Sequence, residues 1–296
     1  MTILVVGATG PTGRAAVAAL VAAGERVRAL TRDVERASAI PELAGAELVG
    51  GDSSEPDGLG AAFAGAEKLY LVPPTAPGWG GMQSRLVEAA VAGGVRHVVK
   101  LSAIGAGPDQ PSMSLRFHWQ GEQEIEASGI PFTHVRGNSF SQNTLFDAET
   151  IRAEDRFYSC VGSSRFAKVD TRDVGEVVAR VLTEPGHEGR TYELTGSEPL
   201  SYADMAQALT EALGRTIEYV DMAGEDYAAA LVAAGFPDWL AREFVDIYER
   251  GWYGEGRGAA TTDDVERVLG RPPRRYADFA RDYADAFGRA STPAPS

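Results

Sequence analysis

Residues 3–13 read Ile-Leu-Val-Val-Gly-Ala-Thr-Gly-Pro-Thr-Gly, and this stretch decides the fold. An apolar, β-branched run is followed at once by glycines at positions 7, 10 and 13. An alanine-rich helical pattern then covers residues 14–23, and Gly24 is its expected stop. The order predicts a strand, a tight turn and a helix. Such a turn points free backbone N–H groups and the positive end of a helix dipole at one place, which favours an anion.

The three glycines have separate expected roles in this turn. Gly7 permits a conformation that a Cβ obstructs, Gly10 lets the backbone approach a pyrophosphate, and Gly13 lets the helix lie close to the strand. The spacing G-x-x-G-x-x-G differs from the best-known dinucleotide fingerprint, G-x-G-x-x-G. We interpret the turn as a nucleotide site, with a tight strand-to-helix turn that binds nothing as the alternative. The residues between the glycines belong to the same predicted site: Thr9, Pro11 and Thr12.

Composition indicates a soluble globular protein, because 44% of the 296 residues are hydrophobic and 24% are charged. The net charge of −14 argues against nucleic-acid binding, which needs a basic face. Cys160 is the only cysteine, so an intrachain disulfide is excluded. No basic leader and no apolar run of about 18 residues is present, so we expect a cytoplasmic protein without membrane contact. The four histidines show no metal-ligand spacing, and no metal is expected.

Strand patterns alternate with helical ones through the first half of the chain. Strands are expected at 3–6, 26–31, 46–50, 68–72, 95–102 and 132–136. This alternation predicts a parallel, doubly wound α/β sheet, in which all strand carboxyl ends meet at one ligand-binding edge. Later, a helix is expected to open at Asp173 with a D-x-x-E capping pattern, and residues 191–194 look like one more strand. Residues 221–287 read as mostly helical, with a mobile loop at 251–258, and the tail 289–296 is expected to be disordered.

The end of the second strand indicates which dinucleotide is bound. Arg32 stands where an acidic residue would select NAD(H), and its guanidinium can bind the 2′-phosphate of NADP(H). The alternative is that Arg32 is a solvated surface charge and that Asp33 caps the next helix. Asp52, with Ser53, follows the third strand and is placed to face the adenine, although it can equally cap a turn. An apolar wall beside the ribose and nicotinamide is expected from Val72, Pro73 and Pro74.

These residues together make the chain similar to the short-chain dehydrogenase/reductase superfamily, specifically its atypical, NmrA-like branch. The resemblance implies a Rossmann-type NAD(P)-binding domain over 1–137 and 165–196. It also implies a smaller, mostly helical substrate domain over 138–164 and 197–288. Further implications are NADP(H) as cofactor and chemistry on carbonyls, quinones or related acceptors, although some members of the branch are redox-sensing regulators. The resembling segments span nearly the whole chain: 7–13, 30–33, 51–52, 95–102, 128–136, 169–174, 192–196 and 261–272.

The superfamily's usual catalytic residues are a Ser and a Tyr-x-x-x-Lys pair, and this chain departs from them. Ser102 matches the serine, whereas His118 aligns with the Tyr and Glu122 with the Lys. The two side chains are four residues apart on one helix face. The carboxylate can then raise the imidazole pKa, and His118 can serve as general acid. The alternative is a partly buried histidine that only stabilises the fold.

The segment after the sixth strand is expected to pass the nicotinamide and enter the substrate pocket. Asn138 and Asn143 are candidates to orient a substrate oxygen, with Phe140 packing on the substrate. The alternative for all three is loop hydrogen bonding and core packing. Trp79 lies in a Pro- and Gly-rich segment, 77–81, that reads as a flexible loop covering the pocket.

The sequence therefore predicts an NADPH-dependent oxidoreductase that transfers a hydride to a quinone, ketone or enone without the usual Tyr-x-x-x-Lys relay. A non-catalytic NADP(H)-sensing regulatory protein is the first alternative. A non-redox use of the fold, such as isomerisation or lyase chemistry with bound cofactor, is the second. The expected partner is a small-molecule substrate, and the expected assembly is a monomer or homodimer.

Overall fold

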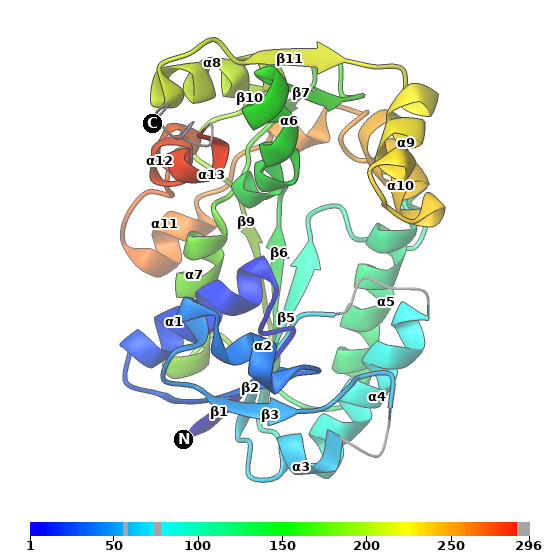
Figure 1. Cartoon of the computed structure of the whole chain (residues 1–296). Helices are drawn as coiled ribbons and strands as arrows, with labels where there is room; N and C mark the ends of the chain where they lie inside the picture. The colour runs from blue at the N-terminus through cyan, green and yellow to red at the C-terminus, as the bar shows by residue number, and fades with distance from the viewer. Residues whose placement is uncertain (56–58, 74–77, 289–296) are drawn as a thin grey trace.

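Seven parallel strands form the central sheet in the computed structural model, which describes residues 1–55, 59–73 and 78–288 (Figure 1). Their order is β3-β2-β1-β4-β5-β6-β9. The paired residues Val6 with Leu71, Leu71 with Lys100 and Ser102 with Arg136 bring the carboxyl ends of four central strands to one edge. The strands are β1 (Thr2–Val6), β2 (Arg26–Thr31), β3 (Glu47–Gly50), β4 (Lys68–Leu71), β5 (His97–Ala103), β6 (Phe132–Gly137) and β9 (Arg190–Leu194).

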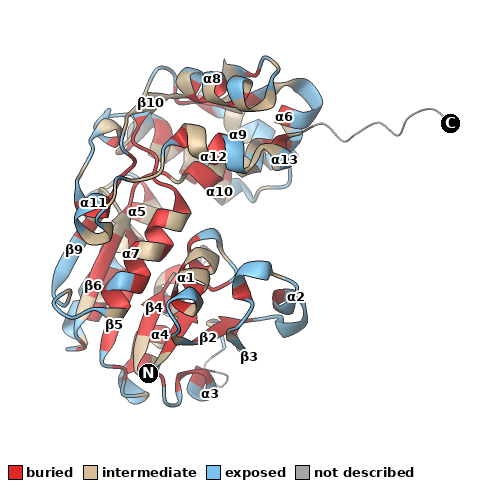
Figure 2. Ribbon diagram, turned by 90° about the vertical axis from the view of Figure 1, so that its left-hand side faces the viewer, coloured by how far each residue is buried: buried red, intermediate tan, exposed pale blue. Residues whose placement is uncertain are grey.

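Helices cover both faces of this sheet, as expected for a doubly wound fold. On one face, α1 (Pro11–Ala22) and α7 (Thr171–Thr183) pack on a core of small and β-branched side chains. The two helices touch backbone to backbone, because a Cβ on Gly175 would lie 2.4 Å from the carbonyl carbon of Ala15. On the other face, α3 (Leu59–Phe63), α4 (Trp79–Ala92) and α5 (Met113–Ala127) enclose a second core. Figure 2 shows the buried strands between these layers. The α/β Rossmann-type sheet is confirmed.

A third core lies beyond the carboxyl edge of the sheet, in the upper part of Figure 1. It is rich in aromatic rings, among them Phe157, Phe166 and Phe279, which are at most 1% exposed. Two small sheets, β10-β8 and β11-β7, accompany its helices, and the sequence patterns did not predict these four strands. The elements are η3 (Ser141–Asp147), α6 (Ala148–Glu154), β7 (Arg156–Ser159), β8 (Arg165–Phe166), β10 (Leu200–Ser201), α8 (Tyr202–Leu213), β11 (Glu218–Asp221), α9 (Gly224–Ala233), α10 (Asp238–Val245), η4 (Asp246–Arg250), η5 (Arg257–Ala259), α12 (Tyr276–Asp282) and α13 (Ala284–Phe287).

The start of α7 differs from the expected one. The helix begins at Thr171, and the Asp170 carboxylate caps it by accepting a hydrogen bond from the Arg172 amide. Asp173, expected to open the helix, is fully buried and binds Arg271 and Arg274 instead. This ion cluster fixes the segment between α11 (Asp264–Leu269) and α12 against α7, so the D-x-x-E pattern serves tertiary contacts and not a capping box. The expected stop at Gly270 is confirmed, with φ +71°.

Two further expectations concern the loops and termini. Residues 251–258, expected to be a mobile loop, form turns that pack on the rest of the chain. The carbonyl of Gly258 accepts hydrogen bonds from the Asn138 side chain and from the Ala167 amide. The tail 289–296 lies outside the described residues. In the described part of the chain, no helix is long and apolar enough to cross a membrane.

Candidate functional site

The glycine turn between β1 and α1 has the geometry expected for its three glycines. Gly7 adopts φ +75°, and a Cβ there would lie 2.7 Å from the Val72 Cβ, so no other residue fits. The Gly10 amide closes the turn by donating to the Gly7 carbonyl at 3.0 Å. A Cβ on Gly13 would lie 2.1 Å from the same carbonyl oxygen, so this position lets α1 approach β1.

The amino end of α1 is open and uncapped, which fits a dinucleotide. Gly10 is the N-cap and provides no side chain, so the amides of Thr12 and Gly13 are among those that a helix leaves unpaired. A Cβ on Gly10 would meet only the Gly7 carbonyl at 3.4 Å, so the space above the turn is free for a pyrophosphate. Thr9 and Pro11 are exposed, whereas the Thr12 side chain is 3% exposed, which leaves its amide as the group available to a ligand.

Arg32 is exposed at the carboxyl end of β2, where the sequence placed a group for the 2′-phosphate. Asp33 caps α2 (Val34–Ser38) by accepting from the Arg36 amide at 2.9 Å, as the alternative interpretation held. The Asp52 carboxylate accepts from the amide and hydroxyl of Ser54, both at 2.8 Å. These bonds, with a smaller effect of Arg32, lower the pKa of Asp52. Asp52 therefore caps a turn close to Arg32, and its contact with adenine stays a prediction.

The apolar wall begins where β4 ends. Val72 packs against the glycine turn and Pro73 is buried, which places both beside the open end of α1. Pro74 lies outside the described residues. Ser53 is half-buried and its carbonyl accepts from the Arg85 side chain at 3.3 Å, so its backbone is tied to α4.

A buried lysine that sequence reasoning missed lies among the side chains of β5, α5 and β6 at the carboxyl edge of the sheet. These side chains, Lys100, Ser102, His118, Glu122 and Arg136, form the reaction edge. Lys100 on β5 is 0% exposed, and its Nζ lies 3.0 Å from the Leu101 carbonyl and 3.2 Å from Nδ1 of His118. Burial lowers the pKa of Lys100 to about 7, although Glu122 opposes this shift. The available signal was a charged residue inside the apolar strand 98–101. A continuous apolar run indicates a strand that is buried on both faces, so the lysine side chain is expected to be buried too.

His118 does not have the environment expected from its helix. It is half-buried on α5, and burial together with the neighbouring Lys100 holds the pKa of its imidazole well below its ordinary value. A protonated imidazole tuned by Glu122 was therefore the wrong expectation. The Lys100 ammonium donates to Nδ1, which makes the neutral Nε2–H tautomer of His118 the one that the site holds.

Glu122 faces Arg136 and not His118. Its carboxylate accepts two hydrogen bonds from the Arg136 guanidinium, Oε1 from Nε at 2.9 Å and Oε2 from Nη2 at 2.7 Å. Burial opposes ionisation of Glu122, but Arg136 and the Ser102 hydroxyl outweigh it and lower the pKa of the carboxyl. Ser102 on β5 is 2% exposed beside this ion pair. Glu122 thus joins α5 to β6. His118 and Glu122, which the resemblance placed in one relay, therefore pair with different residues, His118 with Lys100 and Glu122 with Arg136.

Trp79 is not part of a flexible loop. It is the first residue of α4, is 3% exposed, and packs its ring on Phe117 and His118 at centroid distances of 5.5 and 5.2 Å. The Pro- and Gly-rich sequence hid this helix start, because tertiary contact with α5 outweighs local propensity. Trp79 therefore packs on the His118 ring from the first turn of α4, and its contact with a substrate stays a prediction.

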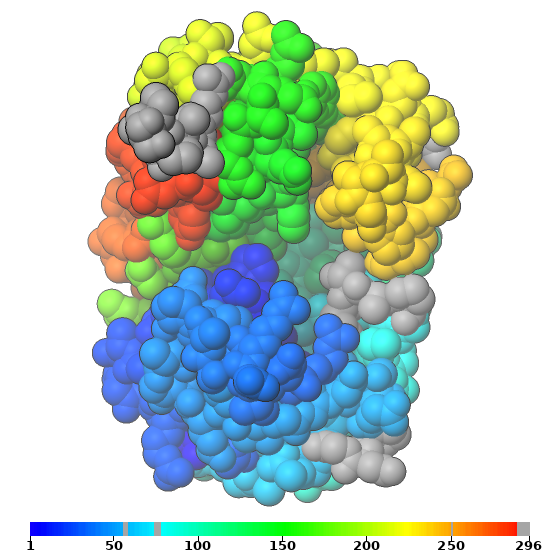
Figure 3. Space-filling view, viewed as in Figure 1, coloured from blue at the N-terminus to red at the C-terminus, as the bar shows by residue number. Residues whose placement is uncertain are grey.

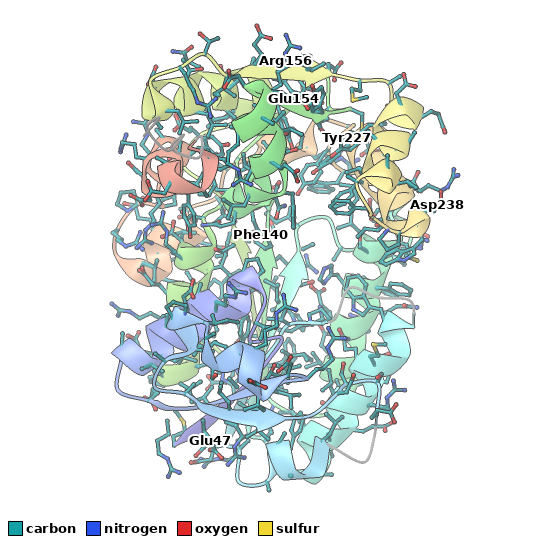
Figure 4. All side chains as sticks on the ribbon, viewed as in Figure 1. Glu47, Phe140, Glu154, Arg156, Tyr227 and Asp238 are labelled. Atoms are coloured by element: carbon teal, nitrogen blue, oxygen red, sulfur yellow. The ribbon has the colours of Figure 1, made fainter. Side chains whose placement is uncertain are left out.

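The three candidates after β6 have different surroundings. Asn138 is 4% exposed; its Nδ2 donates to the Gly258 carbonyl and its Oδ1 accepts from the Ser139 amide, so loop hydrogen bonding holds for this residue. Phe140 is half-buried where the sheet meets the aromatic core, as its label in Figure 4 shows. Asn143 lies further along η3 and lines a cavity.

This cavity of about 310 Å³ lies among η3, α6, α8, α9 and η4. Its walls are mainly aromatic, and Figure 4 labels Glu154 and Tyr227, which line it from α6 and α9. Asp147 and Lys168 also line it, and neither was singled out from the sequence. Among the residues that the structure describes, no group of three or more His, Cys, Asp or Glu can hold a metal ion.

Known proteins are similar to this chain in sequence and in fold. The model of the NmrA-like family matches residues 1–256. The NAD(P)H azoreductase of Xenophilus azovorans is 37% identical over 288 residues, which cover 97% of this chain and 100% of that protein. The NADPH-dependent quinone oxidoreductase of Escherichia coli, solved with NADPH, has a TM-score of 0.83 and 27% identity, covering 95% and 99% of the two chains.

The Citrobacter sp. triphenylmethane reductase complexed with NADP(H) covers the same shares, with a TM-score of 0.80 and 26% identity. The family model thus spans far more than half of the sequence, and a relative above 30% identity spans nearly all of it. With its seven-stranded sheet and its glycine turn, the chain belongs to the NmrA-like family.

Proposed function

We propose that this protein is an NADPH-dependent reductase that transfers a hydride to a quinone, ketone or enone. The observation that carries the proposal is the Lys100–His118 pair, which stands at the same sheet edge as the open glycine turn. A dinucleotide across this edge has its pyrophosphate at α1 and its nicotinamide over β4 to β6. Relatives that are NAD(P)H-dependent reductases support the same reaction class.

NADPH is the proposed cofactor because Arg32 presents an exposed guanidinium at the end of β2. The guanidinium matches the geometry of a phosphate, which only NADPH carries on its adenosine ribose. Thr12 and Gly13 hold the pyrophosphate through their amides, and Val72 with Pro73 shields the nicotinamide side. When bound, the cofactor supplies the hydride.

The chain's own residues supply the proton. His118, neutral and fixed as the Nε2–H tautomer, donates from Nε2 to the acceptor oxygen on which negative charge develops. Lys100 lies 3.2 Å from Nδ1 and passes its proton to that nitrogen, so the imidazole is restored to neutrality with its tautomer reversed. The starting state returns when Nε2 takes a proton from solvent and Nδ1 gives its proton back to the buried Lys100 amine, so each turnover consumes one solvent proton. This pair replaces the absent Tyr-x-x-x-Lys, with the lysine carried on the strand and not on the helix.

A quinone needs less proton assistance than a plain ketone, because it accepts a hydride readily and its product takes a proton from water. Two outcomes therefore separate the acceptor classes. If the acceptor is a ketone, His118→Ala lowers turnover by about 10²-fold, the low end for loss of general acid catalysis. If it is a quinone, the same variant keeps most of its turnover and changes mainly KM.

The testing experiment follows NADPH oxidation at 340 nm over a panel of quinones, ketones and enones. Turnover with at least one class supports the proposal. Tight NADPH binding by calorimetry without oxidation of any acceptor contradicts it and favours the NADP(H)-sensing alternative. Product formation without net NADPH consumption favours the non-redox alternative.

A further inference from the structure

The aromatic cavity above the sheet edge is lined by a buried lysine and a half-buried aspartate that the proposed proton transfer does not use. Lys168 is 5% exposed, donates to the Ser139 hydroxyl at 3.1 Å, and lies 5.2 Å from the centre of the Tyr202 ring. Asp147, the last residue of η3, also lines the cavity. Lys168 acts on the Asp147 carboxylate as the nearby opposite charge, and within the described part of the chain the two groups form no direct ion pair.

Asp147 has an unusual surrounding for a carboxylate. Within the described ranges, no residue donates a hydrogen bond to its side chain, and the only opposite charge that acts on it is Lys168. Burying a carboxylate is costly unless it is hydrogen-bonded, so the half-buried Asp147 side chain favours a ligand that supplies a donor. Asp147 thus has room for a donor, and Lys168, whose ammonium carries three N–H groups and donates one of them to Ser139, can donate another to a ligand at the same place.

The rest of the cavity is aromatic and accepts a flat ring. Eight of the lining side chains carry an aromatic ring, among them Phe157, Tyr202, Tyr227, Phe236, Phe244 and Tyr248. A volume of about 310 Å³ is sufficient for one or two fused rings. Figure 3 shows the hollow between the green segment around α6 and the yellow helices α9 and α10. The segment from Gly137, at the end of β6, to Asp147, at the end of η3, connects the carboxyl edge of the sheet to this cavity.

We infer that this cavity binds a hydroxylated aromatic ring, with one phenolic oxygen between Lys168 and Asp147. The phenolic O–H donates to the Asp147 carboxylate, and the same oxygen accepts from the Lys168 ammonium. One hydroxyl group thus satisfies both buried charges, while the ring fills the aromatic wall. The inference rests on the proposed function in taking this ring as part of the reducible acceptor, which makes hydroxylated polycyclic aromatics the substrate class.

The test measures binding and not turnover, so it is independent of the reductase proposal. 2-Naphthol and naphthalene, neither of which accepts a hydride here, are titrated into the NADP⁺-saturated full chain by equilibrium dialysis. We expect 2-naphthol to bind at least tenfold more tightly than naphthalene. Asp147→Leu and Lys168→Met should each remove about tenfold of this preference, the size of a hydrogen bond to a charged group. Naphthalene affinity should not fall.

Glu154→Leu is the matched control. Glu154 lines the same cavity, but it is exposed and its carboxylate already accepts from the Tyr158 hydroxyl at 2.6 Å. Its removal should leave the preference for 2-naphthol unchanged. An equal loss in Glu154→Leu, or an unchanged preference in both Asp147→Leu and Lys168→Met, overturns the inference. Absence of NADPH oxidation with intact 2-naphthol selectivity contradicts only the proposed function.

The wild-type protein gives a second readout if Asp147→Leu does not fold. Burial raises the pKa of Asp147 to about 7 against the attraction of Lys168, and burial lowers the pKa of Lys168 to about 8. The preference for 2-naphthol should therefore be greatest between these two values, and a pH-independent preference contradicts the inference. The tyrosines that face Asp147 have pKa values raised by burial and do not titrate in this range: Tyr202, Tyr227, Tyr248 and Tyr276.

Discussion

The glycine turn and the reaction edge lie along the same edge of one sheet, yet they are built in opposite ways. The turn is made of backbone from consecutive residues, 7–13, and its geometry follows from where a Cβ is excluded. The reaction edge is made of side chains from β5, α5 and β6, with Lys100 reaching His118 and Arg136 reaching Glu122. A local backbone site is specified by the order of residues, whereas a side-chain site is specified by the packing of separate elements.

Valine substitutions at two glycines of the turn should separate folding from binding, with the largest effect of all. Gly13→Val places a Cβ 2.1 Å from the Gly7 carbonyl oxygen and 2.8 Å from the Ala8 Cα, where only backbone movement relieves the clash. We expect a loss of about 4 kcal/mol or more in the free energy of unfolding, measured by urea denaturation. Gly10→Val meets only one atom at 3.4 Å, so it should fold and lose dinucleotide binding in calorimetry.

Gly60→Val is the control for these two variants. Gly60 lies on α3 with open space around its Cβ position, so stability and cofactor affinity should both stay near those of the wild type. A folded Gly10→Val variant with unchanged NADPH affinity would place the pyrophosphate elsewhere.

Glu122→Gln should show that the second pair at the reaction edge is structural. The carboxylate is 1% exposed and neutralises Arg136 through two hydrogen bonds, so its removal leaves a partly buried guanidinium uncompensated. We expect a loss of about 3 kcal/mol in unfolding free energy, with little change in kcat at a pH well below the pKa of Lys100, where the lysine stays protonated without the Glu122 charge. Because folding lowers the pKa of Glu122, its contribution is present at neutral pH and is lost as pH falls through that lowered pKa.

The stability difference between wild type and Glu122→Gln should therefore shrink in acid. Glu126→Gln is the matched control on the same helix, since the Glu126 side chain is 40% exposed in its pair with His134 and should cost less than about 1 kcal/mol. A large loss of kcat in Glu122→Gln without a loss of stability would return Glu122 to the proton relay.

Local backbone features can be predicted from the sequence, whereas contacts between side chains of distant elements cannot. The strand 26–31, the glycine turn and the stop at Gly270 are local patterns, and all three are observed. The role of Asp173 was wrong because its partners, Arg271 and Arg274, are about a hundred residues away. Trp79 was assigned to a loop because its burial depends on α5. Lys100 and Lys168 were missed because nothing local shows which side chain a buried lysine will meet.

Lys100→Met tests whether the buried lysine acts in the reaction or only fills space. Methionine keeps the length of the side chain in a site that is 0% exposed, so the fold should be as stable as the wild type or more so. With a ketone acceptor we expect kcat to fall about 10²-fold, because Nδ1 of His118 loses its proton donor. Wild-type kcat should decrease as pH rises through about 7, the lowered pKa of Lys100, and the variant should lose this dependence.

Lys68→Met controls for the removal of a lysine from the sheet. Lys68 is the first residue of β4, at the opposite edge, and its Nζ binds the Leu182 carbonyl at 2.5 Å. Its replacement should change stability and leave the pH profile of kcat as in the wild type. An unchanged profile in Lys100→Met would mean that the proton comes from water or from another residue.

Arg32→Ala should have the smallest effect and should act on cofactor choice alone. Arg32 is exposed at the carboxyl end of β2 and lies close enough to Asp52 to help lower its pKa. Removing one guanidinium from a solvent-exposed phosphate contact should weaken NADPH about tenfold, measured as Kd by calorimetry, and leave NADH nearly unchanged. Arg26→Ala is the matched control, because Arg26 is exposed at the other end of the same strand and should affect neither dinucleotide.

Since the contact is exposed, the wild-type preference for NADPH should also decrease as salt rises from 0.05 to about 0.5 M, and Arg32→Ala should remove most of that dependence. Equal weakening of both dinucleotides by Arg32→Ala would mean that the residue supports the turn and does not read the 2′-phosphate.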